Sequence, residues 1–235
     1  MFRLLRFIGR SIGYSILAAL IGLVLVQFWF FLHIWYWVDH NPSSTAFMDA
    51  RLERLREKNP QTALEYRWVS YARISPNLKR AIVVAEDAKF LGHEGFDWDG
   101  IRSAFERNRQ KGKVVAGGST ISQQLAKNLF LSGERTWWRK AQEAVITVMM
   151  EAVMSKRRIL EIYLNVIEWG NGVFGAEAAA RYHFGVPASE LSAGQAAQLA
   201  AMVPSPHRYG PGTETPYLAR RTEIILSRMG AVALP

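Results

Sequence analysis

The sequence predicts an all-α domain preceded by one transmembrane helix. The run from Ile12 to Val38 contains no charged side chain. After it, most segments repeat apolar residues every three or four positions, which is the period of an amphipathic helix. The alternation typical of strands is confined to one candidate, a short hairpin at 66–71. These observations together favour a helical domain on a membrane stalk.

Composition limits the class of protein before any motif is considered. The 235 residues allow one domain or at most two, and a hydrophobic content of 49% excludes a disordered chain. The absence of cysteine excludes a disulfide framework, a thiol nucleophile and a cysteine-based zinc site. The net charge is +9, from 29 basic and 20 acidic residues. For a basic domain beside a membrane, an anionic lipid head group is the expected partner, and nucleic acid is not.

The uncharged run is long enough to be a membrane anchor. As a helix it would extend about 40 Å, more than the roughly 30 Å of a hydrocarbon core. Arg3, Arg6 and Arg10 precede it, so the positive-inside rule puts the N-terminus in the cytoplasm and the rest of the chain outside. A cleaved signal peptide is the alternative, but its apolar core is normally about 7–15 residues. The expected division is a cytoplasmic tail (1–11), a transmembrane helix (12–38), a connector (39–65) and one exported domain (66–235).

Helix signals dominate the exported part. The connector is expected to contain a short helix over 47–58 that ends at Asn59-Pro60, and Ser75-Pro76 is typical of an N-cap followed by proline at the first helical position. Leu78, Ala81, Ile82 and Ala85 then fall on one face. The basic stretch 107–113 and the glycines at 112, 117 and 118 indicate a loop. Further helices are predicted over 120–129, 137–154, 156–168, 175–184, 192–202 and 216–229.

The first segment that could carry chemistry covers 86–97 and reads EDAKFLGHEGFD. Glu86 flanks the apolar face at the end of its helix. Partial burial and the negative end of the helix dipole would both raise its pKa. A carboxylate nearer neutrality is what a general base requires. The alternative is a solvated acidic helix end.

The second segment covers 117–128 and reads GGSTISQQLAKN. Thr120 and Gln123 fit a capping box, and Thr120, Gln124 and Lys127 form a polar stripe. A glycine pair opening a helix exposes amide groups that favour phosphate oxygens, and Lys127 could add a charge. The segment lacks the Gly-Lys-Ser/Thr ending of a P-loop. An ordinary amphipathic helix with a flexible entry is the alternative.

The third segment covers 139–143 and places Arg139, Lys140 and Glu143 within about one helical turn. Arg139 and Glu143 could form an ordinary surface i, i+4 pair. Alternatively, Arg139 and Lys140 bind phosphate and Glu143 is a second active-site carboxylate. A fourth segment, 156–165, is mostly a core stripe whose basic start could extend a phosphate site. The five histidines show no metal-ligand spacing, so no metal ligand is predicted. The sequence also contains no Ser-x-x-Lys tetrad of an acyl-serine enzyme.

In this order and spacing, the motifs resemble those of the peptidoglycan glycosyltransferases, family 51, which polymerise lipid II into glycan strands. The resemblance covers about 66–209 and rests on E-D-x-x-F-x-x-H-x-G, G-G-S-T-I-S-Q-Q-L-A-K-N, R-K-x-x-E and R-I-L-E-x-Y-L-N. An anchor with one domain is similar to the monofunctional branch. Ser122 stands where many members have threonine, and little consequence is expected because both carry a hydroxyl.

The resemblance implies a lysozyme-like helical domain with a smaller membrane-apposed lobe. It implies that Glu86 takes the proton from the acceptor 4-hydroxyl, which attacks the anomeric carbon with inversion and makes a β-1,4 bond. Undecaprenyl pyrophosphate leaves, and Lys127, Arg139 and Lys140 would hold its charge, while Glu143 is a second important carboxylate. The residues implied to shape or line the site are Asp87, Phe90, His93, Thr120 and Gln124.

The resemblance also implies partners and location. The partners would be lipid II, the growing glycan chain, the membrane and cell-wall synthesis proteins. The location would be the bacterial inner membrane, with the catalytic domain in the periplasm. No cofactor is expected to be required, although Mg²⁺ or Mn²⁺ could assist the pyrophosphate chemistry. Two other functions stay open on the residues alone: a lysozyme-like glycan-cleaving enzyme and a non-catalytic scaffold that binds lipid II.

Overall fold

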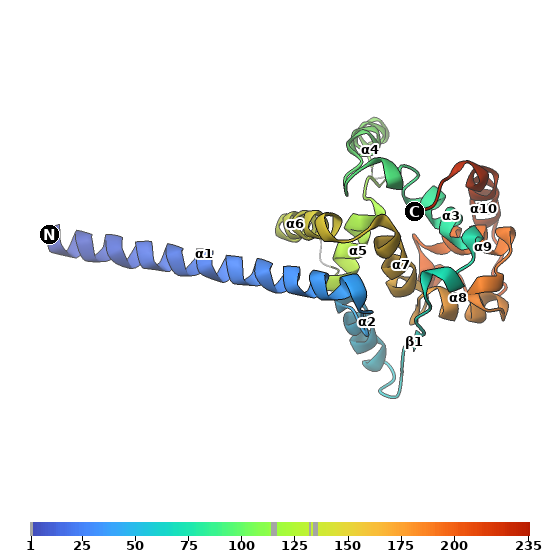
Figure 1. Ribbon diagram of the computed structural model, residues 1–235, viewed down its shortest axis with the longest axis horizontal. Coiled ribbons are helices and arrows are strands. Elements are labelled where there is room, and N and C mark those ends of the chain that lie inside the picture. Colours follow the sequence, from blue (N-terminus) through green and yellow to red (C-terminus); the bar gives the residue numbers. More distant parts are fainter. Residues whose placement is uncertain (1, 114–116, 132, 134–135) are drawn as a thin grey trace. The chain divides into compact units, whose positions relative to one another are not determined.

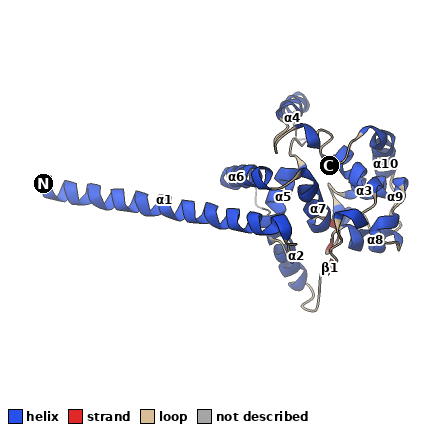
Figure 2. Cartoon of the chain, in the orientation of Figure 1, coloured by secondary structure: helices blue, strands red, loops and turns tan. Residues whose placement is uncertain are grey.

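The computed structural model describes residues 2–113, 117–131, 133 and 136–235, and this part of the chain is mostly helical (Figures 1 and 2). The all-α prediction is therefore confirmed. The chain divides into two compact units, Met1–His40 and Asn41–Pro235.

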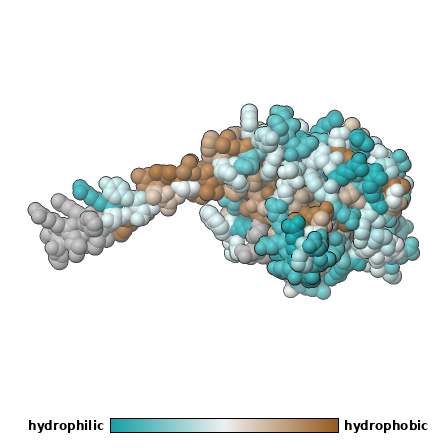
Figure 3. All heavy atoms as spheres, turned by 90° about the horizontal axis from the view of Figure 1, so that it is seen from below, coloured by the Kyte–Doolittle hydropathy of each residue, from teal (hydrophilic) through white to brown (hydrophobic). Residues whose placement is uncertain are grey.

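The first unit is one helix, α1 (Phe2–Asp39). Its segment Gly9–Asp39 has 31 residues and is long and apolar enough to cross a membrane once. Figure 3 shows hydrophobic residues along much of this helix. The predicted membrane anchor agrees with this helix in length and in composition.

The second unit is built from nine α-helices of the described chain, with short 3-10 helices and strands between them. The α-helices are α2 (Ala46–Arg56), α3 (Pro76–Glu86), α4 (Trp98–Lys111), α5 (Ile121–Phe130), α6 (Trp137–Val153), α7 (Lys156–Val166), α8 (Ala176–Phe184), α9 (Ala193–Met202) and α10 (Pro216–Arg228). The 3-10 helices are η1 (Tyr71–Arg73), η2 (Phe90–Gly92), η3 (Ala188–Glu190), η4 (Pro206–Arg208) and η5 (Met229–Ala231). The strands are β1 (Glu65–Tyr66), β2 (Glu168–Gly170) and β3 (Val173–Phe174).

Two groups of helices make the core. In one, α3 packs against α9 and α10, and in the other, α5 packs against α2, α6 and α7. Leu78 and Ile82 of α3 and Ile121 and Leu125 of α5 are fully buried, as their spacing predicts. Burying each of these side chains stabilises the fold by about 1.5–3 kcal/mol relative to leaving it in water. The site described below lies where the C-terminal end of α3 meets α5.

The hairpin predicted at 66–71 is wrong. Instead, β1 pairs in parallel with β3, which pairs antiparallel with β2. The side chain of Asn165 accepts a hydrogen bond from the Val69 N–H and donates one to the Val69 carbonyl, both at 2.9 Å. Because a side chain from α7 occupies both backbone groups of Val69, they are not available for a local hairpin ladder.

The loop predicted at 107–113 is also wrong for most of its length. The basic residues at 107–111 belong to α4, which begins at an Asp97 cap on the Gly100 N–H and ends at Gly112 with φ +63°. Ala104 is the buried residue of this helix, and most of its other side chains are exposed. Residues 114–116, which follow, lie outside the described residues.

The helix expected in the connector forms close to its predicted bounds, as α2. Thr45 caps it through the Met48 N–H, and α2 packs against α5. The Phe47 ring lies 6.3 Å from that of Phe174. This segment therefore contributes to the core of the second unit.

Candidate active site

Glu86 is the last residue of α3, and its side chain is only 11% exposed. Its Oε2 accepts a hydrogen bond of 2.9 Å from Nε2 of Gln124, which stands on α5. The Tyr163 hydroxyl of α7 donates to the other end of the same amide, at 2.9 Å. Three helices thus fix one carboxylate, because each contributes one member of a hydrogen-bonded chain.

A second charged group lies on α6. Glu143 is buried and accepts from Arg139 Nη1 at 2.8 Å and from Lys140 Nζ. Its side chain is 4% exposed and that of Arg139 is 16% exposed. The alternative of an exposed surface pair is therefore wrong for these two residues. The group holds two cations against one anion, so it carries a net positive charge.

Lys127 connects the two groups electrostatically. Burial lowers the pKa of its ammonium, Glu143 raises it, and Arg139 and Lys140 lower it further. The carboxylate of Glu86 also raises it. Lys127 therefore lies within electrostatic range of both carboxylates. Lys127 is thus the residue that relates Glu86 to the cations of α6, and their joint action in one site stays a prediction.

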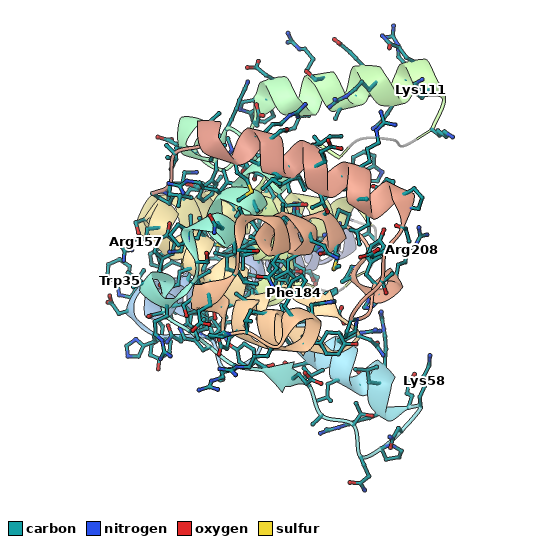
Figure 4. The ribbon with its side chains drawn as sticks, turned by 90° about the vertical axis from the view of Figure 1, so that its right-hand side faces the viewer. Trp35, Lys58, Lys111, Arg157, Phe184 and Arg208 are labelled. Carbon is teal, nitrogen blue, oxygen red and sulfur yellow. The ribbon has the colours of Figure 1, made fainter. Side chains whose placement is uncertain are left out.

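A cleft of about 420 Å³ opens beside Lys127. Gln124 and Lys127 line it from α5, Tyr163 from α7 and Phe47 from α2. Segment 203–208 lines it too, and Figure 4 shows Arg208 in the short helix η4. A cleft of this size with cationic and amide groups in its wall can hold a polar, anionic ligand. Glu86 lies behind Gln124, one hydrogen bond from the cleft wall.

The environment of Glu86 shifts its protonation. Burial raises the pKa of its carboxyl above the ordinary glutamate value, and Asp87 raises it slightly further. The hydrogen bond from Gln124 and the cations Arg221 and Lys127 act in the opposite direction. The net rise agrees in direction with the sequence prediction, and its largest cause is burial. A raised pKa suits a group that accepts a proton near neutral pH.

Asp87, His93 and Thr120 hold the start of α5. Asp87 accepts a hydrogen bond from the Ile121 N–H at 3.1 Å and is paired with Nε2 of His93 at 2.9 Å. Thr120 forms the predicted capping box with Gln123 and donates to the Gly95 carbonyl at 2.7 Å. These contacts set the position of α5, and hence of Gln124 and Lys127. Phe90 is 1% exposed and packs beneath Lys156, whose Nζ lies 4.7 Å from its ring centroid.

Several residues at the site are not among the candidates that the sequence predicts. Arg221 of α10 reaches within 4.0 Å of Glu86, although more than 130 positions separate them. Tyr163 fits the core stripe of α7 and gives no hint that its hydroxyl binds Gln124. Glu168 and His207 meet at 3.4 Å near the cleft, from distant parts of the chain. The signal for Tyr163 is its place in the motif R-I-L-E-x-Y-L-N, whereas only long-range pairing information could have found the other three residues.

No group of three or more His, Asp and Glu side chains converges anywhere in the described ranges. The geometry around Glu86 and Lys127 would suit proton acceptance by the carboxylate and charge stabilisation by the nearby cations. A reaction that removes a proton from one substrate and releases an anion from another would use both. An all-α domain with such a site, following a helix long and apolar enough to span a membrane, is compatible with a group-transfer enzyme.

Comparison with known proteins identifies the family. A family model described as "Transglycosylase" matches residues 53–230, so the chain belongs to the transglycosylase family. This membership confirms the predicted lysozyme-like fold class.

The chain is also similar to curated proteins over nearly its full length. A protein of Laribacter hongkongensis is 67% identical over 93% of this chain and 96% of its own length. One of Methylobacillus flagellatus is 62% identical over 94% of this chain and 96% of its own length. One of Herminiimonas arsenicoxydans is 56% identical over 98% and 100%. Each of the three is named biosynthetic peptidoglycan transglycosylase.

Proposed function

We propose that this chain is a peptidoglycan glycosyltransferase that polymerises lipid II into β-1,4-linked glycan strands. The observation that carries the proposal is the buried Glu86 carboxylate beside a cleft whose wall contains Lys127. The names of the relatives support the substrate class.

In the proposed reaction, Glu86 accepts the proton of the acceptor 4-hydroxyl. The hydroxyl oxygen forms a bond to the anomeric carbon of the growing chain, and the bond from that carbon to the pyrophosphate oxygen breaks. Undecaprenyl pyrophosphate leaves with the electron pair, and the anomeric centre inverts. The base activates the nucleophile by accepting its proton, as in inverting glycosidases, and the leaving group requires positive charge rather than a proton.

The cations have the second role in the proposal. Lys127, Arg139 and Lys140 would stabilise the charge on the leaving pyrophosphate, because charge-assisted hydrogen bonds to phosphate are strong. Glu143 would hold Arg139 and Lys140 in place, which agrees with its two ion pairs. Whether Mg²⁺ or Mn²⁺ assists stays a prediction.

The proposed location follows from α1. A single-pass anchor with three arginines at its N-terminal end would leave that end in the cytoplasm and the catalytic unit in the periplasm. Both substrates have polyprenyl tails, so an anchored enzyme meets them at a raised effective concentration. Cell-wall synthesis proteins are the proposed protein partners.

Polymerisation of purified lipid II by the full-length chain tests the proposal. Glu86→Gln should abolish polymer formation, a loss of at least 100-fold, because the amide cannot accept the proton. Glu190→Gln, an exposed carboxylate on η3, is the matched control and should keep wild-type activity. Polymer formation by Glu86→Gln at the control rate would contradict the assignment of the base. Release of fragments from isolated cell walls, without polymer, would instead identify a glycan-cleaving enzyme.

A further inference from the structure

Helix α10 brings a cation to the rear of the candidate base. Nη2 of Arg221 lies 4.0 Å from Oε1 of Glu86, and the Arg221 side chain is 30% exposed. The oxygen it approaches is the one that Gln124 does not bind, because the amide donates to Oε2. The two carboxylate oxygens thus face different partners, an amide on the α5 side and a guanidinium on the α10 side.

Both facing groups have unused hydrogen-bonding capacity. Oε1 of Glu86 and Nε of Arg221 are buried and have no hydrogen-bond partner in the described part of the chain. A buried carboxylate oxygen without a donor is costly unless a charge compensates for it. At about 4 Å an opposite charge supplies that compensation without a direct hydrogen bond. The guanidinium therefore balances the half of the carboxylate that no donor reaches.

The other groups that face Glu86 come from three places. Asp87 follows it in the chain, Lys127 and Gln124 stand on α5, and Tyr163 stands on α7. Lys127 also faces Glu143, so its charge is shared between two carboxylates. Arg221 has no other ion pair within the described residues. Among the described residues, Arg221 is therefore the cation whose ion pair is with Glu86 alone.

We propose that Arg221 is a positioning residue that keeps the Glu86 carboxylate ionised and aligned, so that the base works at neutral pH. This inference rests on the proposed function of Glu86 as the base. Burial raises the pKa of Glu86, and Arg221 opposes that rise. Loss of the guanidinium would leave more of the base protonated at a given pH.

The test compares Arg221→Gln with Arg220→Gln in the full-length chain. Arg220 is the preceding residue of the same helix and is exposed, so its variant controls for the loss of one positive charge from α10. The rate of lipid II polymerisation is measured against pH. For Arg221→Gln the acidic limb of kcat/KM should move about one pH unit upward, because an opposite charge at this distance shifts a carboxyl pKa by about 1–3 units. The loss of rate should be about tenfold on the acidic side and should shrink as the pH rises.

Arg221→Lys should partly restore the pH profile, because lysine keeps the positive charge but lacks the planar guanidinium with its several N–H donors. Its limb should lie between those of the wild type and Arg221→Gln. A uniform fall in rate at every pH, with an unmoved limb, would overturn the inference in favour of a structural role. An equal shift in Arg220→Gln would overturn it as well.

A second readout does not depend on activity. The carboxyl ¹³C resonance of Glu86 is identified by its absence in Glu86→Gln and titrated in detergent micelles. Its midpoint should rise by about one pH unit in Arg221→Gln and stay unchanged in Arg220→Gln. A wild-type chain that never polymerises lipid II would refute the proposed function, whereas an unmoved ¹³C midpoint would refute the role of Arg221.

Discussion

At the scale of single residues, the orientation of the Gln124 amide decides how Glu86 is held. An amide has a donor end and an acceptor end, and only the donor end can bind a carboxylate. The Tyr163 hydroxyl donates to Oε1 of Gln124, which leaves Nε2 facing Glu86. A fully buried tyrosine thus sets the polarity of the contact to the base.

Tyr163→Phe tests this arrangement. Without the hydroxyl, the amide can turn its oxygen toward Glu86, which repels the carboxylate and raises its pKa. We expect polymerisation at neutral pH to fall about tenfold, equivalent to about 1.4 kcal/mol, and stability to fall by about 1 kcal/mol. The measurements are the rate with purified lipid II and the free energy of unfolding in urea.

Tyr66→Phe is the matched control for this prediction. Its hydroxyl also donates one hydrogen bond of 2.9 Å, to the Pro42 carbonyl in the same unit. It should lose similar stability and keep its activity. Equal activity in the two variants would show that the hydroxyl of Tyr163 does not act through Gln124.

Sequence reasoning found Gln124 and Lys127 on one helix and missed Arg221, which reaches Glu86 from another. Gln124 and Lys127 are three positions apart, so helical geometry alone places them on one face. Arg221 and Glu86 meet because α3 and α10 pack together. No local pattern reports that contact, since it depends on how two distant amphipathic faces are matched in the core.

At the scale of elements, the entry to α8 depends on one glycine. Gly175 has φ +84° and ψ 156°, a backbone region that is essentially restricted to glycine. A Cβ at this position would lie 2.7 Å from the Asn165 carbonyl oxygen of α7. A backbone oxygen cannot move aside as a flexible side chain would. The close approach of Gly175, at the entry to α8, to the backbone of α7 therefore requires the absence of a side chain.

Gly175→Ala should lower the free energy of unfolding by about 3 kcal/mol, because backbone strain and the clash act together. Gly185→Ala is the control, since Gly185 has φ +71° but no atom within 4 Å of its added Cβ. That variant should lose only about 1 kcal/mol, from strain alone. Urea unfolding of both full-length variants measures the difference. Equal losses of unfolding free energy in the two variants would show that Gly175 does not lie in close contact with α7 in solution.

The burial and length of each element decide whether the sequence predicts it. Helices α5 and α7 have complete apolar stripes and side-chain caps, so both their extent and their ends can be predicted from the sequence. Helix α4 buries little, so its charged residues resemble a loop. Strands β1 and β3 have two residues each and pair across more than a hundred positions, so no periodic pattern can develop.

At the scale of the whole molecule, the second unit exposes large apolar side chains on neighbouring helices. Trp137 is 92% exposed and Trp138 is 68% exposed at the start of α6, and Phe105 of α4 is 65% exposed. One groove is lined by Phe105 of α4 and Lys140 of α6, so the two helices are adjacent. Concentrated exposed aromatics beside cations are typical of a surface that meets a membrane interface. An enzyme whose substrates are held in lipid would benefit from such a surface close to its cationic site.

Replacing Trp137 and Trp138 together by serine tests this surface in the anchored protein. In lipid vesicles, the KM for lipid II should rise about fivefold, near 1 kcal/mol, while kcat stays within twofold, because the change affects access to lipid rather than the base. Leu226→Ser, which removes an exposed apolar residue of α10, should change neither constant. The effect should vanish for a short-chain substrate in detergent, where no membrane surface exists. A rise of KM that is equally large in detergent would mean that the tryptophans act on the cationic group of α6 rather than on lipid.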